Sequence, residues 1–208
     1  LGVENILKTS LLPYEDMCRE TGVPLGSKYV VVTFHPVTLE DNTAFEQVEA
    51  LISAMEQKDN YFYLITKANA DVGSEAVNKR LEEFSGQHEN AKLVTSLGMV
   101  RYLSAVKYSE MVLGNSSSGI IEAPALGIPT VNIGDRQKGR LMASTIINCK
   151  ANKADIVSAM EMAAVTEHRV SHLYGDGNTA EKIVQVLKSF LQNGHVDLKK
   201  KFYDLGEL

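Results

Sequence analysis

The sequence predicts a doubly wound α/β fold, in which helices cover both faces of a parallel sheet. Short β-branched or aromatic runs alternate with longer amphipathic runs along most of the 208 residues. The first of these runs, 28–34, is apolar almost without alternation, as expected of a strand that is buried on both faces. Because strands that alternate with helices are joined by right-handed crossovers, we expect them to pair in parallel.

Each strand in the first half of the chain is followed by a helix. A His-Pro pair ends the strand at 28–34, and Thr38 can then cap a helix with Asp41 three residues further on. This helix has an apolar stripe at spacings of three and four residues, formed by Phe45, Val48, Ile52 and Met55.

Two similar strand–helix units follow. Strand 61–66 leads to a helix that Ser74 is expected to cap, with an apolar stripe formed by Val77, Leu81 and Phe84. Strand 91–95 leads to a helix whose inward-facing residues are expected to be Met99, Tyr102, Leu103 and Val106.

The second half of the chain adds three short strands and three helices. The strands are expected at 111–114, 130–134 and 144–149. The first helix follows the loop 115–119 and ends at Gly127 as its C′ residue, and the others cover 152–165 and 178–192. A Gly-x-Gly-x-x-Ala pattern at 175–180 matches a dinucleotide fingerprint, but no convincing strand precedes it, so we interpret it as a turn that begins the last helix.

The composition, 44% apolar and 23% charged, is that of an ordinary globular domain. With 26 acidic and 21 basic residues, the chain has no basic surplus for binding a nucleic-acid backbone. No apolar run approaches the roughly 20 residues that cross a bilayer, and two cysteines without a CxxC motif predict neither a disulfide framework nor a zinc site. We therefore predict a cytoplasmic protein without a signal peptide, a metal, a cofactor, or a nucleic-acid or membrane partner. Because the chain begins with Leu1 rather than methionine, we expect it to be a piece of a longer protein.

Ligands of doubly wound sheets bind beyond the carboxyl ends of the strands, so the loops there carry the candidate functional residues. The most informative loop is Gly-Asn-Ser-Ser-Ser-Gly at 114–119, which opens a helix. Its backbone N–H groups, its serine hydroxyls and the helix dipole would suit a diphosphate, although a helix cap with spare serines is an equal alternative. The loop matches neither a P-loop nor the nucleophile elbow of a serine hydrolase.

Four charged or titratable residues lie near this loop or at other strand ends. Glu122, in the first turns of the helix, could accept hydroxyl protons from a ribose, or it could simply complement the helix dipole. Arg136 and Arg140, four residues apart, fit one helical face and could both reach a phosphate, or they could form a solvated surface pair. His35 could be a general acid, a hydrogen-bond donor to a phosphate, or a structural histidine.

Six motifs, in this order, resemble the UDP-N-acetylglucosamine 2-epimerases. They are His35-Pro36-Val37-Thr38, the loop 69–74, the segment 114–119 with Glu122, Gly127-Ile128-Pro129, the segment 134–140, and Tyr174-Gly175-Asp176-Gly177-Asn178. The resemblance covers about residues 28–190. The His-Pro-Val-Thr form favours the hydrolysing branch, which makes N-acetylmannosamine for sialic-acid synthesis, because the non-hydrolysing enzymes carry a His-Arg pair there.

The resemblance implies a domain organisation. Enzymes of this family have two Rossmann-like domains facing a cleft, the GT-B arrangement, and this chain resembles the C-terminal domain, which binds the nucleotide. Residues 1–27 would then be a connector with one helical stretch from a missing N-terminal half, 28–192 the Rossmann-like UDP-sugar-binding domain, and 193–208 a C-terminal tail. The full-length protein is expected to be a homo-oligomer.

The resemblance also implies roles for single residues. Ser116 and Ser117 would hold the diphosphate, and Glu122 would hold the ribose. Arg136 would hold the diphosphate or nearby nucleotide atoms. Three further residues would line the pocket at the phosphates or the sugar: His35, Asn69 and Leu97. Arg140 is expected in the same site from its spacing alone.

The implied reaction eliminates UDP from UDP-N-acetylglucosamine to give a glycal, which is then hydrated with inversion at C2. The carboxylates that act as acid and base belong largely to the N-terminal domain in this family, so this chain alone is expected to be inactive. Three alternatives stay open: a non-hydrolysing epimerase, the nucleotide-binding domain of a GT-B glycosyltransferase, and a non-catalytic module that binds nucleotide sugars.

Overall fold

The computed structural model describes residues 2–37, 43–69 and 73–192. The helix cap expected at Thr38 and Asp41, residues 70–72 of the 69–74 loop, and the tail 193–208 lie outside these residues.

Six parallel strands form one sheet, as the sequence predicts. They are β1 (Tyr29–Thr33), β2 (Phe62–Thr66), β3 (Ala91–Val94), β4 (Met111–Gly114), β5 (Thr130–Ile133) and β6 (Ile146–Cys149). Their order is β3-β2-β1-β4-β5-β6, and every neighbouring pair is parallel. The chain therefore starts in the middle of the sheet, builds to one edge, and returns to build the other half. The direction reverses between β1 and β4, which is the point where sheets of this kind bind ligands.

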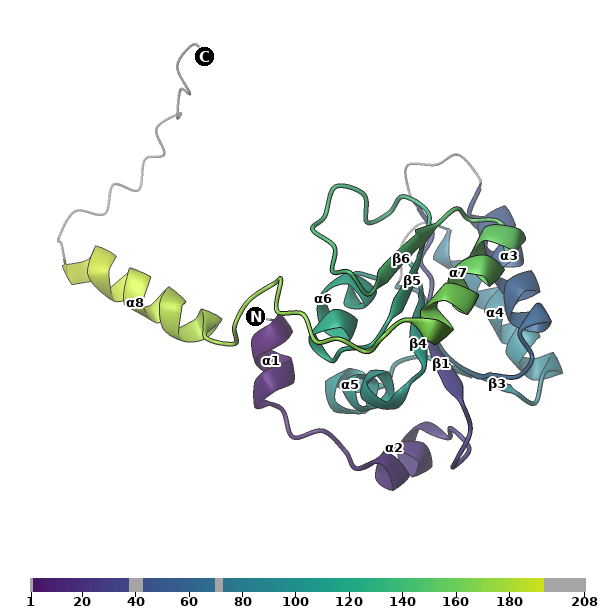
Figure 1. Cartoon of the computed structure of the whole chain (residues 1–208), viewed down its shortest axis with the longest axis horizontal. Coiled ribbons are helices and arrows are strands. Elements are labelled where there is room, and N and C mark those ends of the chain that lie inside the picture. The colour runs from purple at the N-terminus through teal and green to yellow at the C-terminus, as the bar shows by residue number, and fades with distance from the viewer. Residues whose placement is uncertain (1, 38–42, 70–72, 193–208) are drawn as a thin grey trace, which may run out of the picture.

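Helices cover both faces of this sheet (Figure 1). One face packs against α3 (Ala44–Gln57), α4 (Ser74–Gln87) and α7 (Lys153–Val165), and the other packs against α2 (Tyr14–Thr21), α5 (Gly98–Tyr108) and α6 (Ser118–Ala125). Alternate residues of β1 serve the two cores: Val30 and Val32 belong to the first, and Tyr29 and Val31 to the second. All are buried, which explains why the strand shows no alternation of apolar and polar residues.

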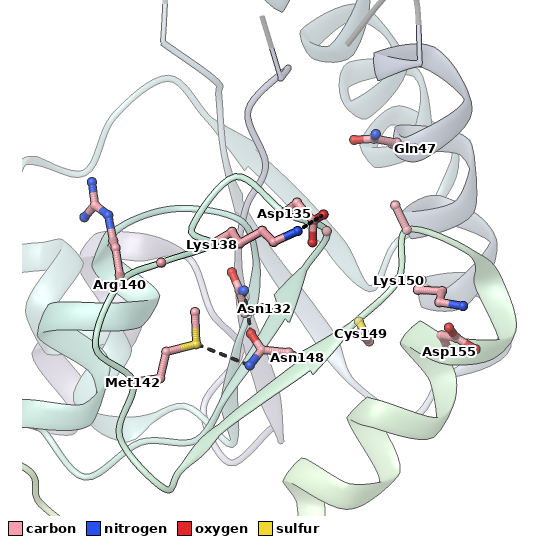
Figure 2. A pocket seen from close by; sticks show the side chains of 13 residues that line it. Gln47, Asn132, Asp135, Lys138, Arg140, Met142, Asn148, Cys149, Lys150 and Asp155 are labelled. Carbon is pink, nitrogen blue, oxygen red and sulfur yellow. Dashed lines mark hydrogen bonds and ion pairs between the residues drawn. The ribbon is translucent and has the colours of Figure 1, made fainter. Parts of the chain in front are cut away.

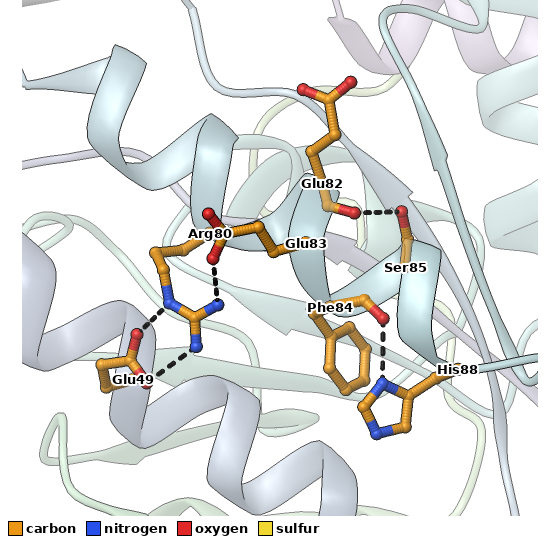
Figure 3. Close-up of polar contacts among 7 residues, drawn as sticks. All are labelled: Glu49, Arg80, Glu82, Glu83, Phe84, Ser85 and His88. Atoms are coloured by element: carbon orange, nitrogen blue, oxygen red, sulfur yellow. Dashed lines mark hydrogen bonds and ion pairs between the residues drawn. The ribbon is translucent and has the colours of Figure 1, made fainter.

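An arginine links two helices on the first face (Figure 3). Arg80 of α4 donates through Nε and Nη2 to the two carboxylate oxygens of Glu49 in α3, and its Nη1 donates to Glu83 at 2.7 Å. A bidentate pair fixes the orientation of both side chains, so this contact holds α3 and α4 in register over the sheet.

The N-terminal segment contains two helices where the sequence predicted one. In α1 (Gly2–Lys8), Val3 and Ile6 pack with Leu103 and Ala125 from α5 and α6. In α2, Met17 is fully buried in the core of the second face. Both helices are therefore packed against the body that carries the sheet, while the domain boundaries drawn from the sequence stay predictions.

Three local predictions were wrong. Phe45 and Met99 are each 51% exposed, because both lie in the first turn of their helix, ahead of the part that packs on the sheet. Ser74 does not cap α4: Gly73 occupies the N-cap position with φ +84°, and the buried Ser74 is the first helical residue.

The last helix, α8 (Thr179–Gln192), extends away from the sheet (Figure 1). The turn before it begins the helix as predicted, with Asp176 accepting a hydrogen bond from the Asn178 N–H at 3.2 Å. At its start the buried carboxylate of Glu4 accepts from the Ala180 N–H at 2.8 Å, which connects α8 to α1. Throughout the described ranges, every helix is too short or too polar to cross a bilayer.

Candidate functional site

A cavity of about 660 Å³ opens at the carboxyl ends of β1, β2, β3 and β4. It lies where the order of the strands reverses, so the loops after β1 and β4 form its floor. Seven of the eight candidate residues from the sequence line it: His35, Asn69, Leu97, Ser116, Ser117, Glu122 and Arg136. The structure brings these residues together from five loops and, for Glu122, from α6, while their roles in binding stay predictions.

The two central strands approach each other unusually closely at this point. Gly114, the last residue of β4, has φ +138°, and a Cβ atom there would lie 2.0 Å from the carbonyl oxygen of Thr33. Five residues later, a Cβ atom on Gly119 would lie 2.7 Å from Cγ2 of Thr130 in β5. The two glycines of the 114–119 segment therefore allow the end of β4 to lie close against β1 and allow α6 to rest against the sheet.

Asn115 is the hub that joins three loops of the site. It is 1% exposed, its Oδ1 accepts from the His35 N–H at 2.7 Å, and its Nδ2 donates to the His35 carbonyl at 2.8 Å. Its own carbonyl accepts from Arg136 Nη1 at 3.1 Å and from Gln137 Nε2 at 2.8 Å. The loops after β1, β4 and β5 are thereby held in one arrangement before any ligand arrives.

The start of α6 has the features of an anion site. Ser117 occupies the N-cap position without a side-chain cap, and Ser116 Oγ accepts only a long hydrogen bond, 3.3 Å, from the Ser118 N–H. Within the described part of the chain, the N–H groups of Ser116 and Ser117 have no acceptor. Donors of this kind at the positive end of a helix dipole, with the guanidinium of Arg136 beside them, suit a phosphate or diphosphate.

The ring of His35 is oriented by the loop after β2. Its Nδ1 accepts from the Asn69 N–H at 3.3 Å, and the residue is 5% exposed. A ring nitrogen that accepts a hydrogen bond carries no proton, so the neutral ring carries its proton on Nε2. The loop after β2 thereby fixes the orientation of this ring at the edge of the cavity.

Several residues that line the cavity were not predicted from the sequence. Thr33 and Thr66, at the ends of β1 and β2, share a hydrogen bond of 2.6 Å between their hydroxyls. Tyr102 of α5 lines the cavity, and its buried hydroxyl, like that of Ser118, has no hydrogen-bond partner among the described residues. Burial raises the pKa of the Tyr102 hydroxyl, and the neighbouring Ser118 and Thr33 hydroxyls offset only part of that effect. The Tyr102 hydroxyl is therefore a neutral group buried beside the Ser118 and Thr33 hydroxyls in the wall of the cavity.

Arg140 is the one candidate residue that the structure places elsewhere. The segment 134–140 is a series of turns, with left-handed Gly134 and Gly139, and not a helix. The expectation that Arg136 and Arg140 share one helical face is therefore wrong. Arg140 instead lines a second hollow, next to the cavity on the far side of this segment. Among the described residues, no group of three or more His, Cys, Asp or Glu side chains is placed to hold a metal ion.

The chain is similar to epimerases that act on nucleotide sugars. A family profile described as "UDP-N-acetylglucosamine 2-epimerase" matches residues 3–188. Polysialic acid biosynthesis protein P7 of Escherichia coli is 33% identical over 213 residues, covering 100% of this chain and 54% of that protein. The GDP/UDP-N,N'-diacetylbacillosamine 2-epimerase (hydrolyzing) of Campylobacter jejuni is 33% identical over 205 residues, covering 96% of this chain and 53% of that protein. The chain thus spans about half the length of the curated relatives it matches.

Solved structures show the same fold. The UDP-GlcNAc 2-epimerase of Methanocaldococcus jannaschii, in complex with UDP-GlcNAc and UDP, superposes with a TM-score of 0.69 at 19% identity, covering 90% of this chain and 53% of that one. The enzyme of Neisseria meningitidis bound to UDP-GlcNAc gives a TM-score of 0.70 at 15% identity, with 90% and 52% covered. At these identities, the comparison shows the arrangement of helices and strands alone.

Proposed function

Because the chain belongs to the UDP-N-acetylglucosamine 2-epimerase family, we propose that it is the nucleotide-binding half of a hydrolysing enzyme that converts UDP-N-acetylglucosamine and water to N-acetylmannosamine and UDP. The three hydrolysing or polysialic-acid relatives, about half of whose length this chain covers, support this subtype. The whole protein would then supply a sugar for sialic-acid-type biosynthesis, as a homo-oligomer with a second Rossmann-like domain.

The observation that carries the proposal is that side chains and backbone groups suited to bind a phosphate and to bind hydroxyl groups meet in one cavity. The diphosphate would accept hydrogen bonds from the backbone and hydroxyls of Ser116 and Ser117 at the start of α6. Arg136, which Asn115 orients through its carbonyl, would pair with the same phosphates. One turn further along α6, Glu122 lines the cavity and would accept hydrogen bonds from the ribose hydroxyls.

These groups also explain how the chain would assist the reaction. The C1–O bond to UDP breaks as the proton at C2 leaves, and negative charge grows on the departing diphosphate. The fixed donors of Ser116, Ser117 and Arg136 would stabilise that charge, because they need no reorganisation at the moment of bond breaking. His35, which lines the cavity, would contact a phosphate or sugar oxygen of the bound substrate. Water then adds across C1 and C2 of the glycal, and the carboxylates that move the C2 proton would come from the other half of the enzyme.

Product analysis tests this function. The whole protein that contains this chain is incubated with UDP-N-acetylglucosamine in D₂O, and the products are followed by NMR. The proposal expects UDP and N-acetylmannosamine with deuterium at C2, while the 208-residue chain alone releases no UDP. Formation of UDP-N-acetylmannosamine would show the non-hydrolysing reaction instead, and release of UDP only when an acceptor is added would show a glycosyltransferase.

A further inference from the structure

The second hollow, of about 790 Å³, lies at the carboxyl ends of β5 and β6 (Figure 2). The turns 134–140 form one side of it, and the first turn of α7 forms the other. None of the described residues lines both this hollow and the cavity at β1–β4. Arg136 lines the cavity, whereas Asp135 and Lys138 of the same turns line the hollow, so the turns separate two adjacent spaces.

The floor of the hollow contains a buried amide with an unsatisfied end. Asn132 of β5 is 2% exposed, and its Nδ2 donates to Asn148 Oδ1 of β6 at 2.7 Å. Its Oδ1 is buried and has no hydrogen-bond partner among the described residues. Figure 2 shows this oxygen pointing away from Asn148, toward the turn that carries Asp135 and Lys138. A buried carbonyl without a donor is unfavourable, so the group is suited to a ligand that supplies one.

The unsatisfied end does not depend on which way the amides are turned. Within the described ranges, Asn148 Nδ2 donates only to the weak acceptor Met142 Sδ, at 3.2 Å. If both amides were rotated, Asn148 would donate to Asn132, and the buried orphan atom would become a donor instead of an acceptor. A hydroxyl group can satisfy either arrangement because it both donates and accepts.

The charges around the hollow favour an uncharged ligand. Lys138 and Asp135 pair with each other at 3.6 Å, and their side chains are 79% and 74% exposed, which places them at the rim. The floor is neutral: besides the two asparagines it includes Met142 and Cys149, and burial raises the pKa of the Cys149 thiol to about 12. Arg140 and Lys150 also line the hollow but are exposed, and Asp155 adds a second carboxylate, so the described residues of the floor offer a ligand neutral groups and no cationic donor.

We propose that this hollow is a separate carbohydrate site, which binds the pyranose ring of a free N-acetylhexosamine. A ring hydroxyl or the acetamido N–H would donate to Asn132 Oδ1, Met142 would contact the apolar face or the acetyl methyl group, and Asp155 and Lys150 would bind the remaining hydroxyls. The choice of an N-acetylhexosamine rests on the proposed function, which releases such a sugar next to the hollow. The existence of the site rests on Asn132 alone.

Side-chain amide NMR signals of the isotope-labelled chain test the proposal. N-acetylmannosamine is titrated in the presence of saturating UDP, and N-acetylglucosamine, mannose and UDP-N-acetylglucosamine are titrated separately. We expect saturable shifts of the Asn132 and Asn148 amides with the free acetamido sugars, and weaker shifts with mannose. Sugar shifts that UDP abolishes, or shifts at these amides only with the nucleotide-linked sugar, would overturn a separate site.

Variants distinguish this proposal from the proposed function. Asn148→Ala removes an exposed partner of the floor amide and Asn132→Leu replaces the amide itself, so each is expected to weaken sugar binding about tenfold and to leave UDP binding unchanged. The matched control, Ser117→Ala, is expected to weaken UDP binding and leave the sugar shifts intact. Unchanged sugar affinity in folded Asn132→Leu and Asn148→Ala variants overturns the site, whereas a failure of UDP to bind overturns the nucleotide proposal and leaves the sugar titration readable.

Discussion

Asn115 and His35 exchange two hydrogen bonds, one in each direction between the side chain of Asn115 and the backbone of His35. These residues follow β4 and β1, which are neighbours in the sheet but are separated by 80 residues in the chain. The pair therefore links the segments that follow β1 and β4, at the point where the strand order of the sheet reverses. Because the Asn115 carbonyl also accepts from Arg136 and Gln137, one residue organises most of the proposed phosphate site.

Replacing Asn115 should destabilise the protein. Asn115→Ala leaves the buried N–H and carbonyl of His35 without the partners they have here, so we expect a loss of about 2 to 4 kcal/mol in the free energy of unfolding. Urea unfolding measures it, with the exposed Asn5→Ala as a control that should change stability by less than about 0.5 kcal/mol. Equal stability of the two variants would contradict the role of the pair.

Gly119 is expected to resist substitution for a steric reason. A Cβ atom there would lie 2.7 Å from Cγ2 of Thr130, so Gly119→Ala should push α6 away from β5 and destabilise the fold by about 1 to 3 kcal/mol. Gly86 in α4 is the matched control, because a Cβ atom at that position would meet open space among the described residues and alanine favours helices. Gly86→Ala should stabilise by about 0.5 to 1 kcal/mol. Thermal unfolding of both variants tests the pair, and destabilisation by both would refute the steric explanation.

The contact between α3 and α4 predicts a measurable contribution from one arginine. Arg80 binds Glu49 with two donors and Glu83 with a third, so Arg80→Met should destabilise the protein by about 1 kcal/mol, somewhat more than a simple surface pair. Among the residues that the structure describes, Arg19 pairs only with Asp16 in an exposed position, and Arg19→Met should cost less than about 0.5 kcal/mol. Urea unfolding at low and high salt compares them, and indistinguishable losses would argue against the bidentate clamp.

Buried tyrosines predict a loss of stability at alkaline pH. Burial raises the pKa of Tyr29 above its ordinary value of 10.0, and its hydroxyl donates to the Ala105 carbonyl at 2.6 Å. The unfolded chain therefore loses this proton at lower pH than the folded one. The stabilisation from Tyr29 is fully present below about pH 10 and declines as the pH rises above that value.

Tyr29→Phe separates this effect from other titrations. The variant should be about 1 kcal/mol less stable at neutral pH because it lacks the hydrogen bond to Ala105. Its stability should then fall less steeply than that of the wild type above about pH 10. Urea unfolding across this range measures both slopes, and parallel slopes would exclude Tyr29 as a contributor.

Most of the fold could be predicted because its signals are local. The unbroken apolar run of β1, the loop between β4 and α6 and the left-handed Gly127 each depend on neighbours in the sequence, and the structure confirms all three. Phe45 and Met99 show the limit of such reasoning, because helical spacing does not tell how far along a helix the sheet reaches.

The candidate site likewise contains positions that could be predicted from the strands and contacts between distant segments that could not. Seven residues converge because each directly follows a strand or begins the helix after it, and parallel strands bring these positions to one edge. Arg140 was misplaced because the spacing of the two arginines implies a shared face only in a helix, and glycine turns replace that helix. The hub role of Asn115 and the orphan hydroxyl of Tyr102 depend on contacts between distant segments, which no local pattern records.

The most direct test of the central claim is a calorimetric titration of this chain with UDP, repeated with Arg136→Ala and Arg140→Ala. Arg136 lies beside the start of α6, whereas Arg140 lines the separate hollow. Since a hydrogen bond to a charged group contributes about 1.5 to 3 kcal/mol, Arg136→Ala should weaken UDP binding about tenfold or more, and Arg140→Ala should change it by less than about twofold. Equal effects of the two substitutions, or unchanged affinity in Arg136→Ala, would contradict a diphosphate at the start of α6.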